Sequence, residues 1–422
     1  MSTAAIHLDP MGRILSLDPH AEALLGVEAS AVTRERLAMF VPGPVALAQL
    51  PGWLATAARD GCWEGDGLLR HRDGRALACH LRLSASLAEG RAVGFTLEPT
   101  PLEGIAPESL APPEGLGATL GRFAAITRLP FVTASVLPVL LGLAVAAWAG
   151  VAFAWLPAVL AVLATLLLHL GANTANDWFD WRGGADAVNK EAIPPFSGGS
   201  RALPMGLISE RGLLVLIATC FGLGGLCGLG VVLLGNPWLL AIGVAGALLG
   251  FAYSAPPLRL VARRGLGELA IFLAFGPLLT LAGYAAAGAP LTWGAALVGA
   301  PAGLMTSGIL WVNQIPDCAG DRAAGKWNLV AVLGRRRARW GLPVLLGLSH
   351  AVMLALVLTG LLPWAALISL LALPLVVKGT RVVWAHAEDD GVAGACAATV
   401  QHQLVAALLA FLGVLGAALL GG

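Results

Sequence analysis

The sequence predicts an all-α polytopic membrane protein with nine transmembrane helices, preceded by a small soluble α+β domain. Three observations support this fold class. Hydrophobic residues make up 57% of the 422 residues and charged residues only 12%. The mean hydropathy is +0.79. Apolar runs of spanning length begin only after residue 128. Because soluble domains carry about 25% charged residues, most of this chain is expected to lie in lipid.

Residues 1–112 are predicted to form the soluble domain, because no apolar run there approaches the about 20 residues that cross a bilayer. HLDPMGRILSLD predicts two short strands around a turn, and PHAEALLG predicts a helix that ends at Gly26. Residues 67–85 predict a hairpin that turns at Asp73-Gly74, and a last strand follows at AVGFTLEP. Residues 113–121 are interpreted as a linker, and 122–422 as the membrane domain.

The order strand, strand, helices, three strands, with the phrase DPMGRILSLDPHAEALLG, resembles PAS domains. Another small α+β domain is the alternative. The resemblance implies a sensory or regulatory role. Many PAS domains bind haem, flavin or a small ligand, and nothing in this sequence identifies one. The histidines of this region are expected to be surface or packing residues rather than haem ligands: His7, His20, His71 and His80.

The membrane domain contains nine apolar runs of spanning length. They are 129–149, 154–176, 212–234, 237–255, 266–287, 292–315, 341–360, 363–384 and 397–420. Nine spans place the Lys and Arg residues after residue 121 on one side, whereas the opposite loops, such as AGVAFA, GNP and AGAPLT, carry no charge. This asymmetry predicts a cell inner-membrane protein with a cytoplasmic N-terminal domain and an outside C-terminus. The basic run Arg335–Arg337 is expected to be a solvated topology determinant that touches anionic lipid.

Two acidic clusters lie at the cytoplasmic ends of spans. The first contains Asn173, Asn176, Asp177, Asp180 and Asp186, and the second contains Asp317 and Asp321. Spacings of three and four residues place the side chains of each cluster on one helical face, except for the later Asp186. Carboxylate oxygens are ligands that Mg²⁺ prefers, together with substrate phosphates. The two clusters therefore predict a site for two Mg²⁺ ions with a diphosphate between them.

Other polar residues near these clusters are candidates for substrate binding. Four cations are expected to hold phosphate oxygens: Lys190, Arg201, Arg322 and Lys326. Tyr253 is a candidate substrate contact, although an interfacial tyrosine belt explains it equally well. Functional and purely structural readings stay open for Glu268, His169, Gln314, His402, Gln403 and the loop Ser197–Ser200.

The motifs NDWFDWRGGAD, PFSGGSRALPMGLIS, YSAPPLRL and NQIPDCAGDRAAGKWNLVAVLG resemble the UbiA superfamily of intramembrane aromatic prenyltransferases. The resemblance covers about residues 120–420 and implies a bundle of nine helices with Mg²⁺-dependent transfer of an isoprenyl group from a polyprenyl diphosphate to an aromatic acceptor. It assigns catalytic or metal-binding roles to Asn173, Asn176, Asp177, Asp180, Asp317 and Asp321. The first motif departs from the commonest form, because position 184 is Gly and the third acid is Asp186. This form resembles the menaquinone-pathway branch, which uses dihydroxynaphthoate.

Other classes of function are less consistent with the sequence. A net charge of +1 provides no basic field for nucleic acid. The six cysteines show no disulfide-like spacing. Two alternatives to the enzyme remain, a PAS-containing membrane receptor without catalysis and a transporter. The receptor lacks an output segment after the bundle, and transporters place coupling residues near the bilayer midplane rather than at span ends.

Overall fold

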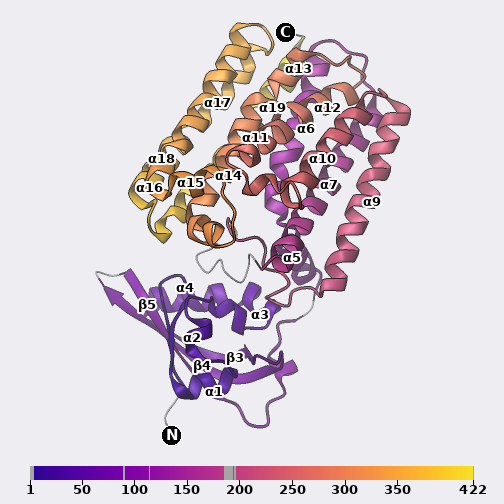
Figure 1. Cartoon of the computed structure of the whole chain (residues 1–422). Coiled ribbons are helices and arrows are strands. Elements are labelled where there is room, and N and C mark those ends of the chain that lie inside the picture. Colours follow the sequence, from indigo (N-terminus) through magenta and orange to yellow (C-terminus); the bar gives the residue numbers. More distant parts are fainter. Residues whose placement is uncertain (1–3, 89–90, 114, 185–192, 194–195, 422) are drawn as a thin grey trace. The chain divides into compact units, whose positions relative to one another are not determined.

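The protein divides into two compact units in a computed structural model that describes residues 4–88, 91–113, 115–184, 193 and 196–421 (Figure 1). The sheet unit comprises Met1–Ile126 together with Arg201–Glu210. The helical unit comprises Thr127–Ser200 and Arg211–Gly422. The loop that follows the first acidic cluster is therefore shared between the two units.

The sheet unit contains one antiparallel sheet of five strands in the order β2-β1-β5-β4-β3. The strands are β1 (Ile6–Leu8), β2 (Ile14–Leu17), β3 (Cys62–Arg70), β4 (Ala76–Ala88) and β5 (Arg91–Pro101). Four helices lie between β2 and β3: α1 (Pro19–Leu25), α2 (Ala29–Val32), α3 (Gly43–Ala48) and α4 (Leu50–Asp60). The expected order of strands and helices is confirmed.

Local sequence explains these elements. Helix α1 begins where Asp18 Oδ1 accepts the Ala21 N–H at 2.7 Å, and it ends at Gly26 in the left-handed conformation, φ 69°. Leu81 and Leu97 of the sheet are fully buried, and Trp53 of α4 stacks on Trp63 of β3 with ring centroids 4.6 Å apart. These side chains belong to one buried cluster, so the unit has a hydrophobic core of its own. Burying each large apolar side chain contributes roughly 1.5–3 kcal/mol to the free energy of folding.

The helical unit begins within α5 (Leu116–Thr127) and is almost entirely α-helical. Its helices are α6 (Thr133–Trp148), α7 (Trp155–Arg182), α9 (Glu210–Leu234), α10 (Leu239–Ser254), α11 (Leu266–Leu273), α12 (Leu279–Ala286), α13 (Trp293–Val298), α14 (Ala300–Ala323), α15 (Leu329–Leu333), α16 (Arg335–Ala338), α17 (Gly341–Leu358), α18 (Leu373–His386) and α19 (Ala393–Leu420). A π-helical turn, Ala274–Leu278, joins α11 to α12 around Pro277, and a 3₁₀ segment, Trp364–Ala372, precedes α18.

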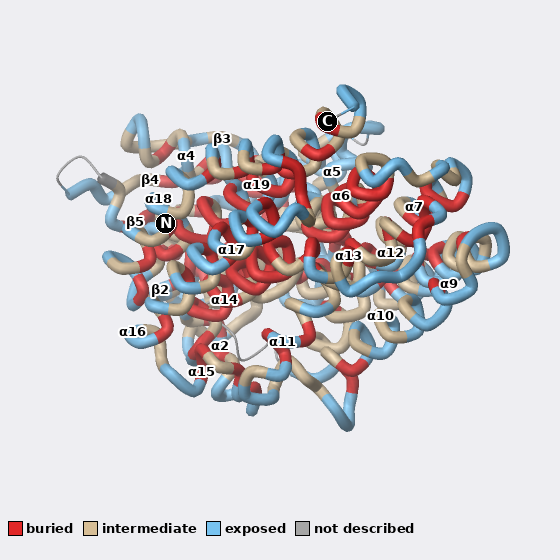
Figure 2. Tube along the Cα trace, turned by 90° about the horizontal axis from the view of Figure 1, so that it is seen from above, coloured by how far each residue is buried: buried red, intermediate tan, exposed pale blue. Residues whose placement is uncertain are grey.

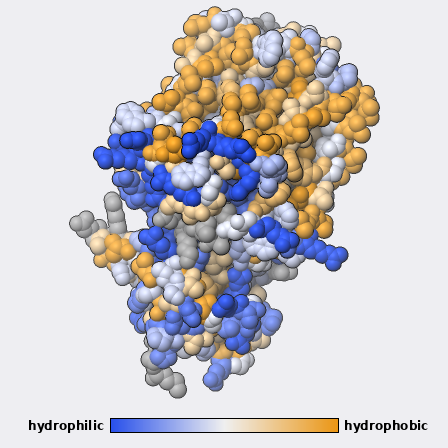
Figure 3. All heavy atoms as spheres, in the orientation of Figure 1, coloured by the Kyte–Doolittle hydropathy of each residue, from blue (hydrophilic) through white to orange (hydrophobic). Residues whose placement is uncertain are grey.

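Eight helical segments among the described residues are long and apolar enough to cross a bilayer. The expected span 237–255 corresponds to the shorter apolar helix α10, which has 16 residues. Hydrophobic residues cover most of the visible surface of the helical unit, and hydrophilic residues gather at the end where α15 and α16 lie (Figure 3). This distribution is that of an integral membrane protein.

Helix α14, which carries the second acidic cluster, lies among largely buried (red) segments of the helical unit (Figure 2). In the span formed by α13 and α14, 72% of the apolar window is buried, against 17% for α9. Close packing elsewhere depends on small residues, because a Cβ on Gly142 of α6 would lie 2.1 Å from Thr280 O of α12. The second acidic cluster is therefore carried by a largely buried helix.

Candidate active site

The first acidic cluster lies on the last turns of α7. Asn176 Nδ2 donates to Asp180 Oδ2 at 3.3 Å, and Ser254 Oγ of α10 donates to Asn176 Oδ1 at 2.6 Å. Asn173 Nδ2 donates to the carbonyl oxygen of Thr127 at 3.2 Å. The two asparagines therefore fix the end of α7 against neighbouring segments, and Asn176 also orients the Asp180 carboxylate.

The second acidic cluster lies on the last turns of α14. Asn328 Nδ2 donates to Asp321 Oδ2 at 2.7 Å, and its Oδ1 accepts the Ala331 N–H at 2.7 Å as the N-cap of α15. The backbone N–H of Lys326 also donates to the carbonyl oxygen of Asp321 at 2.7 Å. The loop after α14 thus folds back onto its own acidic end.

An ion pair joins the two clusters. Lys326 Nζ lies 2.7 Å from Asp180 Oδ1, although the residues are 146 positions apart in sequence. Burial by itself would lower the pKa of Lys326, but the Asp180, Asp321 and Asp317 carboxylates outweigh it and raise that pKa above its usual range. Lys326 is therefore a buried, charged ammonium group between the two acidic helix ends.

The loop Ser197–Ser200 also contacts both clusters. The Gly198 N–H donates to Asp317 Oδ2 at 3.2 Å, and the Ser200 N–H donates to Asp177 Oδ2 at 3.1 Å. Gly199 lies so close to Asp177 that a Cβ at this position would be 2.6 Å from Oδ1, and its φ is +70°. Glycine is required here both for space and for the left-handed backbone.

Most of these groups, though not Asp177 or Ser200, line one end of a cavity of about 500 Å³ in the helical unit. Its polar end includes Asn173, Asn176, Asp180, Asp317, Asp321, Lys326 and Asn328. The remaining wall is largely apolar and includes Phe131, Leu168, Ile242, Phe275, Leu278, Ile309 and Leu310. A cavity with one charged end and a long apolar wall suits a ligand that has an anionic head and a hydrocarbon tail.

The carboxylates of Asp180, Asp317 and Asp321 at the polar end fit a divalent cation, and Asp177 lies next to Gly199 of the lining without being a lining residue itself. Asp177 Oδ1 is buried and has no hydrogen-bond partner, which is costly unless a cation or a donor completes it. Hard carboxylate oxygens are the donors that Mg²⁺ prefers. Across the part of the chain that the structure describes, no three His, Cys, Asp or Glu side chains converge as a metal cluster. Asp186 and Lys190 lie outside the described residues.

Comparison with known families identifies the family of this chain. The model of the UbiA prenyltransferase family matches residues 135–397, which contain both acidic clusters and most of the cavity wall. The chain belongs to the UbiA prenyltransferase family. As a member of the UbiA family, it is a membrane-embedded transferase of prenyl groups.

Relatives place this UbiA-family chain near enzymes that act on naphthoate-type acceptors. The 1,4-dihydroxy-2-naphthoate octaprenyltransferase of Mycobacterium tuberculosis is 32% identical over 252 residues, covering 59% of this chain and 81% of that protein. The 2-carboxy-1,4-naphthoquinone phytyltransferase of Synechocystis sp. is 29% identical over 279 residues, covering 64% of this chain and 85% of that protein.

Solved UbiA structures show the same fold. The apo structure of a UbiA homolog from Aeropyrum pernix K1 has a TM-score of 0.52 at 16% identity and covers 67% of this chain and 97% of that chain. The UbiA homolog from Archaeoglobus fulgidus bound to GPP and Mg²⁺ has a TM-score of 0.50 at 17% identity, with 70% and 99% covered.

Of the other polar residues singled out from the sequence, some line the cavity and others make contacts within the bundle. Tyr253, His169 and Gln314 line the cavity. In contrast, His402 Nε2 lies 2.9 Å from His350 Nε2 in the bundle interior. Glu268 Oε1 accepts the Leu329 N–H at 3.0 Å, which favours a structural role.

Two of the expected phosphate-binding cations are engaged elsewhere. Arg322 Nε donates to the carbonyl oxygen of Ala331 at 2.7 Å. Arg201 lies in the sheet unit, where its Nη1 is 3.9 Å from Glu35 Oε2. The cavity instead contains Arg128 and Asn328, to which sequence reasoning gave no role. The only signal for Asn328 is its N-cap position before the apolar run LVAVL.

Proposed function

We propose that this UbiA-family enzyme transfers a prenyl group from a polyprenyl diphosphate to a dihydroxynaphthoate-type aromatic acceptor in a Mg²⁺-dependent reaction. The single observation that carries the proposal is the cavity with one polar end, where two acidic helix ends meet at Lys326. The naphthoate relatives support the acceptor class. In this reaction the allylic C–O bond breaks, the electron pair leaves with diphosphate, and a ring carbon forms the new C–C bond and loses its proton.

We assign a different role in this reaction to each group of site residues. We assign metal binding to Asp177, Asp180, Asp317 and Asp321, with Asp186 as a further candidate and two ions as the expected number. When bound, Mg²⁺ neutralises the charge of the departing diphosphate. We assign phosphate binding to Lys326 and Arg128, which line the cavity, with Lys190 as a further candidate. We assign positioning roles to Asn176, which donates to Asp180, and to Asn173, which donates to the carbonyl oxygen of Thr127. The apolar wall accommodates the prenyl chain and excludes water.

The topology expected from charge is part of the same proposal. We place α10 in the membrane as the ninth span, with the sheet unit and the acidic clusters on the cytoplasmic side and the C-terminus outside. Residues 1–112 are proposed as a PAS-like sensory domain, 113–121 as a linker and 122–422 as the prenyltransferase domain. The cytoplasmic arrangement gives a water-borne diphosphate group access to the cavity.

Product analysis tests the function. Membranes that contain the protein are incubated with dihydroxynaphthoate, hydroxybenzoate or homogentisate and with farnesyl, geranylgeranyl or longer prenyl diphosphates, and products are analysed by mass spectrometry. We expect prenylated naphthalene products that require Mg²⁺ and disappear with EDTA. Transfer to hydroxybenzoate without transfer to dihydroxynaphthoate would overturn the acceptor assignment.

We also propose that the sheet unit regulates the enzyme through the loop between α7 and α9. Ser200 and Gly198 contact the acidic clusters, and the chain then continues directly into Arg201–Glu210, which belongs to the sheet unit. Leu207 is buried there, and Arg70 Nη2 donates to the carbonyl oxygen of Pro204 at 2.9 Å. A change in the packing of Arg201–Glu210 would therefore shift Gly198 and Ser200, whose N–H groups donate to Asp317 and Asp177.

Replacing Leu207 by alanine tests this coupling. The loss of its burial, which weakens packing by about 2–5 kcal/mol, is expected to raise the KM for the prenyl diphosphate by about threefold or more. Leu15→Ala in the same unit is the control, because Leu15 is 54% exposed whereas Leu207 is 6% exposed. Steady-state kinetics of both full-length variants give the readout. Identical kinetics for wild type and Leu207→Ala would exclude the loop as the route of regulation.

A further inference from the structure

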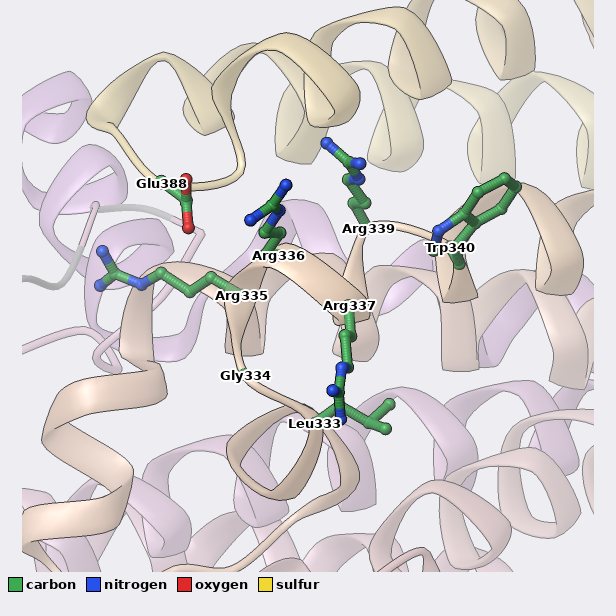
Figure 4. A pocket seen from close by; sticks show the side chains of 8 residues that line it. All are labelled: Leu333, Gly334, Arg335, Arg336, Arg337, Arg339, Trp340 and Glu388. Atoms are coloured by element: carbon green, nitrogen blue, oxygen red, sulfur yellow. The ribbon is translucent and has the colours of Figure 1, made fainter.

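A second pocket, distinct from the active-site cavity, lies at the turn that connects α15 to α17. It has a volume of about 570 Å³ and is lined by Leu333, Gly334, Arg335, Arg336, Arg337, Arg339, Trp340 and Glu388 (Figure 4). Four arginines and one glutamate give it a net charge of +3 (4 − 1). The lining shares no residue with the active-site cavity, so a ligand here would be separate from the substrates.

Two of the arginines hold the turn in place. Arg335 Nε donates to the carbonyl oxygen of Ile315 at 3.0 Å, and its Nη2 donates to that of Pro316 at 2.7 Å. The Arg339 guanidinium lies over the ring of Trp384, 4.5 Å from its centroid. The turn is therefore anchored to α14 on one side and to α18 on the other.

The other two arginines are available to a ligand. Arg336 and Arg337 are exposed, and within the described residues neither side chain has a hydrogen-bond or ion-pair partner. Glu388 also lines the pocket but forms no ion pair with either arginine in the described part of the chain. Guanidinium groups match phosphate oxygens in geometry and charge, so an anionic phosphate is the ligand that this pocket fits best.

The position of the pocket identifies the source of the phosphate. Trp340 is 57% exposed and immediately precedes the transmembrane helix α17, on which Val344 is 61% exposed. Tryptophan is enriched at the level of lipid headgroups, and basic pockets beside membrane helices bind anionic headgroups. The pocket therefore lies where apolar helix surface gives way to a basic turn, which is the position at which a phospholipid phosphate is expected.

We propose that this pocket binds the headgroup of an anionic phospholipid. Arg336 and Arg337, which point to opposite sides of the turn (Figure 4), provide the unpaired positive charge that attracts it. Glu388 accepts a hydrogen bond from a headgroup hydroxyl, so a phosphatidylglycerol-type headgroup fits better than a bare phosphate. Because Arg335 is bonded to the two carbonyl groups that precede Asp317, the bound lipid stabilises the turn of α14 that leads into the second acidic cluster. Lipid binding at this pocket does not depend on which aromatic acceptor the enzyme uses.

Native mass spectrometry of the purified full-length protein tests the site. Delipidated protein in detergent is titrated with dioleoylphosphatidylglycerol or dioleoylphosphatidylcholine, and bound lipid is counted. We expect Arg336→Gln/Arg337→Gln to weaken binding of the first phosphatidylglycerol by about tenfold or more. The matched control Lys378→Gln/Arg381→Gln removes two exposed cations of α18 outside the pocket and is expected to leave that step unchanged.

Three outcomes would overturn the proposal. Equal losses in the two double variants would show that total charge, not the pocket, attracts the lipid. Equal binding of phosphatidylcholine and phosphatidylglycerol to wild type would show that the negative charge of the headgroup does not determine binding. Displacement of the lipid by millimolar inorganic phosphate would identify a site for free phosphate instead. Melting temperatures of both double variants in phosphatidylcholine, expected to match wild type, separate lipid binding from loss of folding.

Discussion

Replacing Asp317 by alanine is expected to lower prenyl transfer by at least about a thousandfold, because it removes a carboxylate from the point where the two acidic helix ends face each other. Asp317 lines the cavity, and its Oδ2 accepts the Gly198 N–H at 3.2 Å. Its removal eliminates a proposed Mg²⁺ ligand and releases the loop from α14. The rate of prenylated product formation with saturating Mg²⁺ is the measurement.

Two matched variants make the Asp317 result interpretable. Asp389→Ala removes an exposed carboxylate that is paired with His386 and lies outside the cavity, and its activity is expected to remain near wild type. Asp317→Asn preserves shape and removes charge, so an equally large loss would assign the effect to charge. Full activity of Asp317→Ala with normal protein levels in the membrane would refute the assignment of the site.

Replacing Lys326 by glutamine is the second large effect that we expect, a loss of about a hundredfold or more in kcat/KM. The variant removes the buried ammonium group that pairs with Asp180 at 2.7 Å and that we assign to phosphate binding. It also leaves the Asp180 carboxylate unpaired. Removing one partner of a buried ion pair lowers the free energy of unfolding by about 3–5 kcal/mol. Because the Asp180 side chain is 23% exposed, we expect a loss near the lower end of this range.

A double variant separates stability from catalysis at Lys326. Asp180→Asn/Lys326→Gln removes both charges, so thermal unfolding is expected to return towards wild type while activity stays low. Lys378→Gln, an exposed lysine on α18, is the control for the loss of one positive charge. Recovery of activity together with stability would show that Lys326 is only a structural partner of Asp180 and does not contact the substrate.

The acidic clusters illustrate how far local spacing predicts a site. Asp177 and Asp180 are three residues apart and Asp317 and Asp321 four apart, so each pair shares a helical face wherever the helix lies. The structure confirms that both clusters end long helices, α7 and α14. The pairing of the clusters with Lys326 and with Gly198 and Ser200 joins segments far apart in the chain, and no periodicity predicts it.

For Arg201, closeness in sequence did not predict the position of the side chain. Its closeness in sequence to the first cluster suggested phosphate binding, yet it lies in the sheet unit beside Glu35. Only a one-residue step separates it from Ser200, which contacts Asp177 in the helical unit. Proximity along a loop therefore says little about which packed unit a side chain joins, because the loop follows the apolar anchors Ala202 and Leu207.

The sequence by itself determined the membrane class, the limits of most spans and the two acidic faces, because the transfer of apolar residues into lipid and the 3.6-residue helical period are local properties of each segment. Only the tertiary structure decided which carboxylate meets Lys326, that Asn328 supports Asp321, and that the loop after α7 is shared between two units. These contacts depend on which helices pack together, and packing is selected by the shape and burial of the whole unit rather than by any one stretch of residues.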